Sequence, residues 1–155
     1  EKYPVYKIED VFHFDKYAPK ASKALQVWSW IQISMVLLLI SYLFGNIAAI
    51  NKLDESYIYI YGAFIFLSVY AFTELMDRSV FAIFWELIKN SMGISLIYIQ
   101  GDWFGASEFF PGMYIALIGY FIVATLISGW FVYIHYKEDR QQKIAVHAQG
   151  SAIQL

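Results

Sequence analysis

The 155-residue sequence contains no cysteine and little charge, and both shortages exclude whole classes of protein. Without cysteine there is no disulfide scaffold, no thiol catalysis, and no zinc or iron–sulfur site with cysteine ligands. Asp, Glu, Lys and Arg make up 15% of the residues, whereas soluble domains carry about 25%. The net charge of −2 argues against the ordinary basic type of nucleic-acid-binding protein, so we expect no nucleic-acid partner.

Apolar residues are abundant instead: 59% of the chain is hydrophobic, 20% is aromatic, and the mean hydropathy is +0.49. A helix needs roughly 20 mostly apolar residues to cross a bilayer core of about 30 Å, and four windows of the chain meet this requirement. We therefore predict an all-α, polytopic membrane protein whose partner is the lipid bilayer. Its predicted parts are a leader or linker at 1–23, four transmembrane helices at 24–50, 56–77, 79–100 and 113–136, and a polar tail at 137–155.

Two other fold classes fit the sequence less well. A soluble four-helix domain needs a polar face on each helix, which these apolar windows do not provide. The alternation in Tyr57–Tyr61 suggests a barrel strand, but barrel strands alternate apolar with polar residues. Here the alternation is aromatic with aliphatic, and it continues into a further apolar run.

The distribution of basic residues predicts the orientation of the chain. With four spans, nine basic residues share one side of the membrane, and only Lys52 lies on the other. The nine are Lys2, Lys7, Lys16, Lys20, Lys23, Arg78, Lys137, Arg140 and Lys143. The positive-inside rule then places both termini in the cytoplasm. The alternative of three spans, with 79–100 lying on the membrane surface, puts the two basic ends on opposite sides.

Aromatic residues cluster near the expected ends of the helices, where rings with one polar atom favour the headgroup level. We expect these residues to act as membrane anchors: Trp28, Trp30, Trp103, Phe104, Trp130, Tyr133 and Tyr136.

Ionisable residues inside a membrane helix cost about 2.5–3.5 kcal/mol each on insertion scales, so each needs a partner. Glu86, Lys89 and Asn90 are three and four residues apart and share one helical face. Three more charged residues lie in the tight turn before this helix, with Glu74 and Arg78 spaced i, i+4. We predict a structural polar cluster of Glu74, Asp77, Arg78, Glu86, Lys89 and Asn90. The alternative is a polar patch that lines a substrate or proton path.

The sequence offers no catalytic, cofactor-binding or metal-binding residue. Its three histidines, His13, His135 and His147, form no HxxxH, HxxHH or HExxH spacing, and each is expected to be solvated or at headgroup level. Neither a phosphate-binding Gly-rich loop nor a GxSxG nucleophile elbow is present.

The run YGAFIFLSVYAFTELMDR at 61–78, with Glu86–Leu87 after it and Trp30–Gln32 before it, carries a resemblance to a known family. Residues 20–105 resemble the C-terminal membrane region of the fatty acid hydroxylase/sterol desaturase superfamily, especially its alkylglycerol monooxygenase-like members. In that region a Leu-hydrophobic-Asp turn is followed by a glutamate. The matching residues here are Leu75-Met76-Asp77 and Glu86.

The resemblance implies a parent oxidoreductase of lipid metabolism, in which a di-iron centre held by histidine boxes activates O₂ against a lipid C–H bond. This chain contains none of those boxes, so no catalytic or metal residue carries over. The expected function is therefore a non-catalytic, membrane-embedded accessory region of a di-iron oxygenase, whose N-terminal catalytic domain is its partner. Because the chain begins with Glu1, we expect a fragment of a longer protein, with 1–23 as the linker.

Two other functions remain open. One is a small standalone membrane scaffold or assembly protein without enzymatic activity. The other is a transporter, which calls for broken helices or internal repeats that are not convincing in this sequence.

Overall fold

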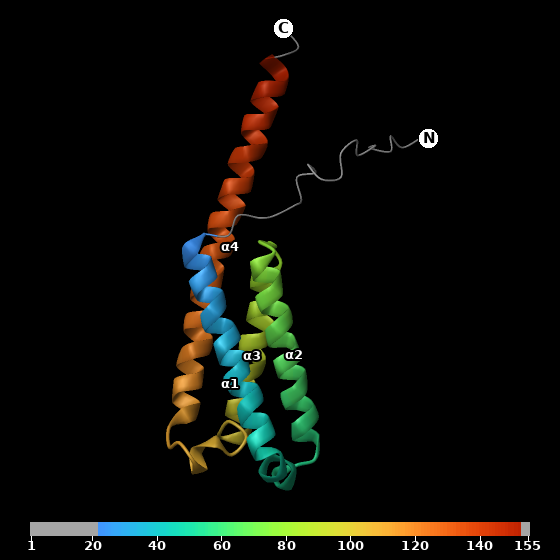
Figure 1. Ribbon diagram of the computed structural model, residues 1–155, viewed down its shortest axis with the longest axis vertical. Coiled ribbons are helices and arrows are strands. Elements are labelled where there is room, and N and C mark those ends of the chain that lie inside the picture. Colours follow the sequence, from blue (N-terminus) through green and yellow to red (C-terminus); the bar gives the residue numbers. More distant parts are fainter. Residues whose placement is uncertain (1–21, 153–155) are drawn as a thin grey trace, which may run out of the picture.

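The computed structural model describes the backbone of residues 22–152 and the side chains of residues 22–141. Within this part the regular structure is entirely helical, as predicted, and the helices form an elongated up-and-down bundle (Figure 1). The predicted linker lies outside the described residues except for its last two positions. The elements are α1 (Lys23–Leu53), α2 (Ser56–Met76), α3 (Ala82–Gln100), the 3₁₀ turn η1 (Ala106–Glu108) and α4 (Met113–Ala152).

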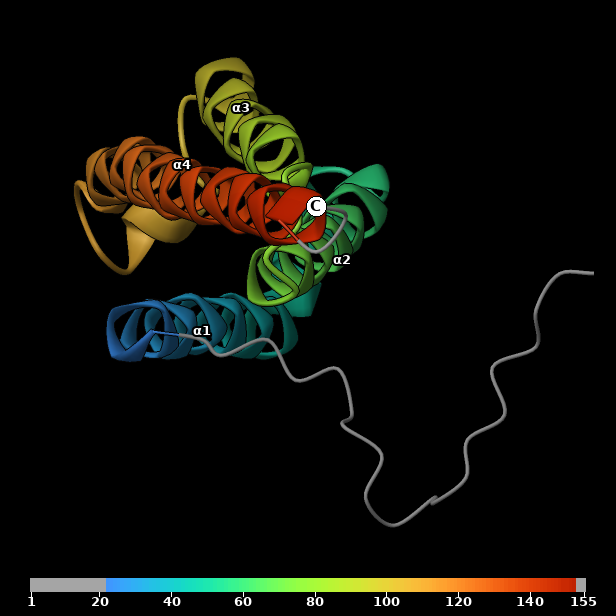
Figure 2. The same cartoon turned by 90° about the horizontal axis from the view of Figure 1, so that it is seen from above.

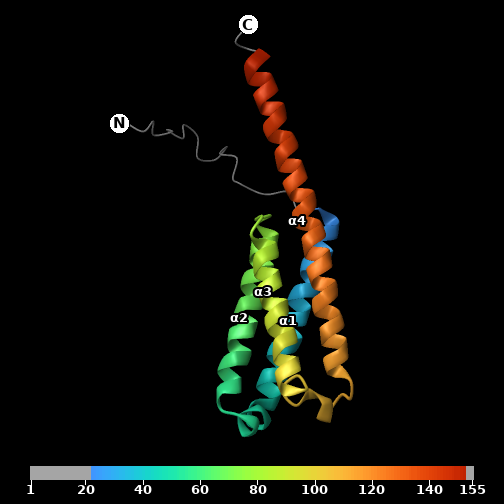
Figure 3. The ribbon, with the colours of Figure 1, turned by 180° about the vertical axis from the view of Figure 1, so that it is seen from behind.

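Helices that follow one another in the chain pack against one another. The backbones of α1 and α2, of α2 and α3, and of α3 and α4 come close to each other at many positions. The backbones of α1 and α4 do not. Viewed along the bundle, α1 and α3 lie on opposite sides of α4 (Figure 2). From behind, α3 and α4 lie side by side, and α4 continues well past the ends of the other helices (Figure 3). The α1–α4 side is therefore the more open side of the bundle.

Three of these helices are long and apolar enough to cross a membrane: α1, α2 and the Met113–Gln141 part of α4. The fourth helix, α3, is not among them, because Glu86 and Lys89 lie near its centre and lower its apolarity. The structure thus supports a helical membrane protein with three apolar helices. By length and composition alone, the structure does not support the predicted four spans.

The third helix begins three residues later than predicted, at Ala82 instead of residue 79. Arg78 has φ 57°, in the left-handed region, and so ends α2. Its N–H donates to the Leu75 carbonyl at 3.1 Å, and the Ser79 N–H donates to the Glu74 carbonyl at 3.1 Å. This pair of bonds is the Schellman end of a helix, a position that glycine usually occupies. The residues between α2 and α3 form the turn in which the chain reverses direction.

The predicted tail at 137–155 is not a separate segment, because α4 continues without a break through residue 137 to Ala152. That stretch contains no proline, and Lys, Glu, Arg, Gln and Ala are favourable helix residues. The first helix is also longer than predicted, because it continues past residue 50 and ends at Leu53. Asp54 then accepts from the Ser56 N–H at 2.7 Å and from its hydroxyl at 2.6 Å, and both bonds lower the pKa of Asp54.

The loop after α3 folds back into the bundle and closes its end with aromatic rings. Trp103 and Phe104 are each 1% exposed, so the prediction that they anchor at the membrane surface is wrong. The Trp103 indole donates to the Tyr61 hydroxyl at 3.2 Å, and that hydroxyl donates to the Leu39 carbonyl at 3.0 Å. Ser107 donates to the Asp102 carboxylate through its N–H and its hydroxyl, and these bonds bridge the segment that holds the two rings.

Much of the outer surface is apolar. Large hydrophobic side chains are exposed on every long helix, for example Phe44, Phe66, Tyr98 and Leu126. A water-soluble monomer rarely exposes so continuous an apolar surface. Four of the predicted anchors are among the exposed residues, namely Trp30, Trp130, Tyr133 and Tyr136. This surface suits a lipid environment.

Close approach of α3 and α4 depends on Gly93. A Cβ built on Gly93 would lie 2.6 Å from Cε2 of Phe121, a fully buried ring of α4. We expect Gly93→Ala to lower the free energy of unfolding by about 1–3 kcal/mol, because the ring must shift within a packed core. Denaturant or thermal unfolding in detergent micelles measures the change.

Gly119→Ala on α4 is the matched control, because a Cβ there meets nothing within 4 Å. It should stabilise the bundle by up to about 1 kcal/mol through helix propensity. Equal effects of the two substitutions would show that Gly93 has no packing role.

Candidate functional site

Polar side chains from α1, α3 and α4 meet inside the bundle. We call Gln32, Glu86, Lys89, Asn90, Thr125 and Ser128 the polar core cluster. Every member except Thr125, which is partly buried, is at least 96% buried, and Glu86 is 1% exposed. The cluster brings together the only charged side chains that are fully buried among the described residues.

One carboxylate oxygen organises the cluster. Oε1 of Glu86 accepts hydrogen bonds from Lys89 Nζ at 2.7 Å, from Asn90 Nδ2 at 3.1 Å and from Gln32 Nε2 at 3.5 Å. The first two partners come from the next turn of α3, at the i, i+3 and i, i+4 positions that a helix brings together. The third comes from α1. The ion pair is thus local, and the amides attach it to the rest of the bundle.

The cluster also joins α1 to α4 across the open side. Ser128 Oγ on α4 accepts from the Trp28 indole N–H at 3.2 Å and from Gln32 Nε2 at 3.4 Å. Asn90 Nδ2 on α3 donates to Thr125 Oγ1 on α4 at 2.8 Å. Since the backbones of α1 and α4 come close at few positions, these side-chain bonds help to close the ring of helices, together with apolar side chains such as Leu25 and Phe131.

The predicted cluster of six residues is in fact two separate groups. Glu86, Lys89 and Asn90 lie together in the bundle interior, as predicted. The other three lie at the α2–α3 turn, where Asp77 is exposed and Arg78 pairs with Glu138 of α4. The spacing of Glu74 and Arg78 implies helical neighbours, but Arg78 has already left the helix.

The sequence prediction missed the α1 and α4 members of the cluster. Gln32, Thr125 and Ser128 are single polar residues in apolar helices, and nothing in the sequence shows that they face Glu86. Trp28, predicted to be a membrane anchor, is 6% exposed and donates to Ser128. The sequence feature that could have pointed to Gln32 is a polar amide within an otherwise apolar stretch, since such a group needs a hydrogen-bond partner.

The histidines also differ from expectation where they are described. His135 is 6% exposed, so it is not solvated, and its ring lies beside Phe131 at 6.5 Å between centroids. It lies one turn before Glu138, where α4 meets the α2–α3 turn. His13 and the side chain of His147 lie outside the described residues.

The described residues do not fit a di-iron centre. In this part of the chain no three His, Cys, Asp or Glu side chains converge in a group that could hold a metal. The histidine boxes of the resembled family therefore have no counterpart among residues 22–141.

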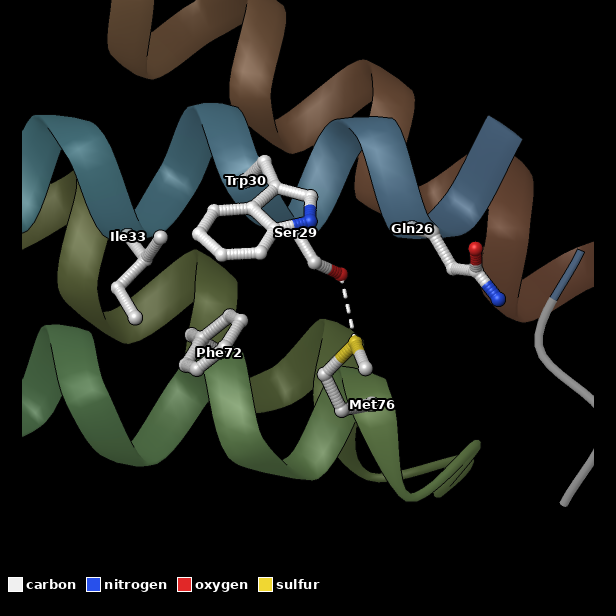
Figure 4. Close-up of a pocket in the computed structure, with 6 residues that line it drawn as sticks. All are labelled: Gln26, Ser29, Trp30, Ile33, Phe72 and Met76. Carbon is white, nitrogen blue, oxygen red and sulfur yellow. Dashed lines mark hydrogen bonds between the residues drawn. The ribbon is translucent and has the colours of Figure 1, made fainter. Parts of the chain in front are cut away.

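Apolar hollows open between the helices on two sides. The one between α1 and α2 has a volume of about 250 Å³, and its wall includes Trp30, Ile33 and Phe72 (Figure 4). The Ser29 hydroxyl lies 2.6 Å from the Met76 sulfur across the same groove (Figure 4).

Two larger hollows lie between α1 and α4. One, of about 400 Å³, is lined at the start of α1 by residues such as Val27 and Ile31, and at Phe131 of α4. The other, of about 370 Å³, lies toward the loop end and is lined by residues including Met35, Trp103 and Leu117. The side of the bundle where the backbones of α1 and α4 come least close is thus hollowed toward both ends.

No protein-family model, curated protein or solved structure matches this chain.

Breaking the ion pair from one side should destabilise the bundle strongly. We expect Glu86→Gln or Lys89→Met alone to lower the free energy of unfolding by about 3–5 kcal/mol, because each leaves a buried charge without its partner. The double variant Glu86→Gln/Lys89→Met should be more stable than either single variant, since it removes both charges. Unfolding in micelles or nanodiscs measures all three, and additive losses would contradict a coupled pair.

Proposed function

We propose that this chain is a four-helix membrane region that supports a lipid-modifying di-iron oxygenase domain of the same polypeptide and performs no turnover by itself. One observation carries the membrane part of the proposal: the side chains of Glu86, Lys89, Asn90 and Gln32 bind one another inside the bundle, while much of the outer surface is apolar. The resemblance over residues 20–105 supports the parent enzyme.

In this proposal α3 is the fourth span. Its 19 residues extend about 28 Å, which is close to the thickness of a bilayer core. Its charged residues face the other helices, so lipid meets the remaining, apolar face. Its neighbours α2 and α4 shield it on two sides. A helix that hides its charges in this way can cross the membrane although its composition falls short of a simple span.

The charges at the two ends of the bundle support an orientation with both termini in the cytoplasm. Arg78 in the α2–α3 turn pairs with Glu138, so that turn lies level with the Lys137–Arg140 stretch of α4. Lys23 starts α1 at the same end (Figure 1). Lys52 lies at the opposite end, in the last turn of α1. Basic residues concentrate on the cytoplasmic side of membrane proteins.

The catalytic domain is proposed to dock against the α1–α4 side. On this side the backbones of α1 and α4 come close at few positions and two apolar hollows of about 400 and 370 Å³ open, so it leaves apolar surface to bury. The hollow between α1 and α2 then borders the path by which a lipid substrate approaches from the bilayer.

The coding sequence immediately upstream of Glu1 separates this proposal from the standalone scaffold. A reading frame that continues into HxxxH and HxxHH boxes supports the oxygenase parent. A start codon at that point supports the scaffold, and it would overturn the proposal.

Cysteine labelling tests the four-span orientation, because the chain has no cysteine of its own. We expect Lys52→Cys to react with a membrane-impermeant maleimide on intact cells and Lys137→Cys to react only after permeabilisation. The unaltered chain is the control and should not be labelled. Labelling of both positions on intact cells, or of neither, would contradict an even number of spans with both ends in the cytoplasm.

Iron analysis tests whether the proposed di-iron centre belongs to the catalytic domain and not to this region. We expect residues 1–155, purified alone, to bind far less than one iron per chain, because their described residues bring no metal-binding group together. The longer parent protein, purified in the same way, should hold its di-iron centre. Stoichiometric iron in the isolated region would place part of the centre here.

A further inference from the structure

A small enclosed cavity lies beside the polar core cluster. Its volume is about 10 Å³, and its wall includes Gln32 and Val36 of α1, Ser68 of α2, Lys89 of α3 and Tyr120 of α4. A site needs roughly 10–15 Å³ and between two and four polar partners to hold one water molecule. The cavity therefore has the size of one water and a wall in which polar and apolar groups are mixed.

Three groups in this wall have unused hydrogen-bonding capacity. The Lys89 ammonium carries three N–H donors, and the hydrogen bond described for it goes to Glu86 Oε1. Gln32 is 2% exposed, and its Oε1 has no hydrogen-bond partner among the described residues. Ser68 Oγ donates to the Phe64 carbonyl at 2.7 Å and still has a lone pair that can accept a bond.

The chemistry of the wall selects among possible occupants. A metal cation is repelled by the Lys89 ammonium. An anion faces the Glu86 carboxylate, 2.7 Å from the same ammonium, and exceeds the volume of the cavity. An apolar group would leave the Lys89 donors and Gln32 Oε1 unsatisfied. Water can both accept from the ammonium and donate to the amide oxygen.

We propose that this cavity binds one internal water molecule, which accepts a hydrogen bond from Lys89 and donates to Gln32 Oε1 and Ser68 Oγ. The water links α1, α2 and α3 at the level of the ion pair, where the direct bond between Gln32 and Glu86 is long, at 3.5 Å. This inference is independent of the proposed function, because it concerns the bundle whatever domain precedes it.

The direction in which a cavity-filling substitution changes Tm tests the proposal. Val36→Ile adds one methyl group beside the cavity. In an empty cavity the extra methyl raises Tm, because it fills a void. With a bound water it displaces that water and leaves polar groups unsatisfied, so we expect Tm in micelles to fall by about 2–4 °C. A rise in Tm would overturn the proposal.

A cycle with Gln32→Met separates loss of water from simple overpacking. Methionine is close to glutamine in size but lacks Oε1, so the water has one partner fewer in that background. We expect the fall in Tm caused by Val36→Ile to shrink by at least half there. A fall of the same size in both backgrounds would show overpacking and overturn the proposal.

A direct observation covers the case in which Gln32→Met does not fold. An experimental structure of the unaltered chain, at a resolution that shows ordered waters, should have a density peak within hydrogen-bonding distance of Lys89 Nζ and Gln32 Oε1. The absence of a peak there, in a map that shows other buried waters, would overturn the proposal.

Discussion

The arrangement of the bundle depends on the buried pair of Glu86 and Lys89. Two charges inside an apolar bundle are tolerated only when they meet each other, and hydrogen bonds from neighbouring amides stabilise the pair further. That requirement fixes which face of α3 points inward. It also requires polar groups of α1 and α4 at the same depth in the bundle, where Gln32 binds Glu86 and Asn90 binds Thr125. The packing of α1 and α4 against α3 is constrained by this one local pair.

The rest of the interior is closed by a different kind of contact. Toward the loop end, Tyr61, Phe64, Trp103 and Phe121 pack in edge-to-face or tilted pairs, with ring centroids 5.1–6.0 Å apart. These rings supply a large apolar area and fill space without requiring a partner for a charge. Close packing of α3 on α4 at Gly93 brings Phe121 into this group. The bundle is thus held by an apolar, aromatic end and a polar centre.

In the proposed function, this combination of a polar centre and an aromatic end explains how the bundle can present a docking surface to a neighbouring domain. Inside a membrane, helices gain little from apolar contact with each other, because lipid tails are equally apolar. Directional hydrogen bonds in the polar core cluster therefore set the geometry, and the α1–α4 side can remain hollowed. Such a bundle can offer an apolar docking surface and still keep its own shape.

Composition and local spacing were enough to predict the helical class, three of the four expected spans and the common helical face of Glu86, Lys89 and Asn90, because these properties follow from single segments of the chain. The sequence also indicated lipid-facing aromatics such as Trp30 and Trp130. It did not separate Arg78 from the interior cluster, since only the folded turn shows Arg78 leaving α2 and reaching Glu138. Nor did it place Gln32 and Ser128 opposite Glu86, or bury Trp28 and Trp103. Those outcomes depend on which faces of different helices meet, and a single apolar helix carries no pattern that specifies the rotation about its own axis. Tertiary packing alone decided them.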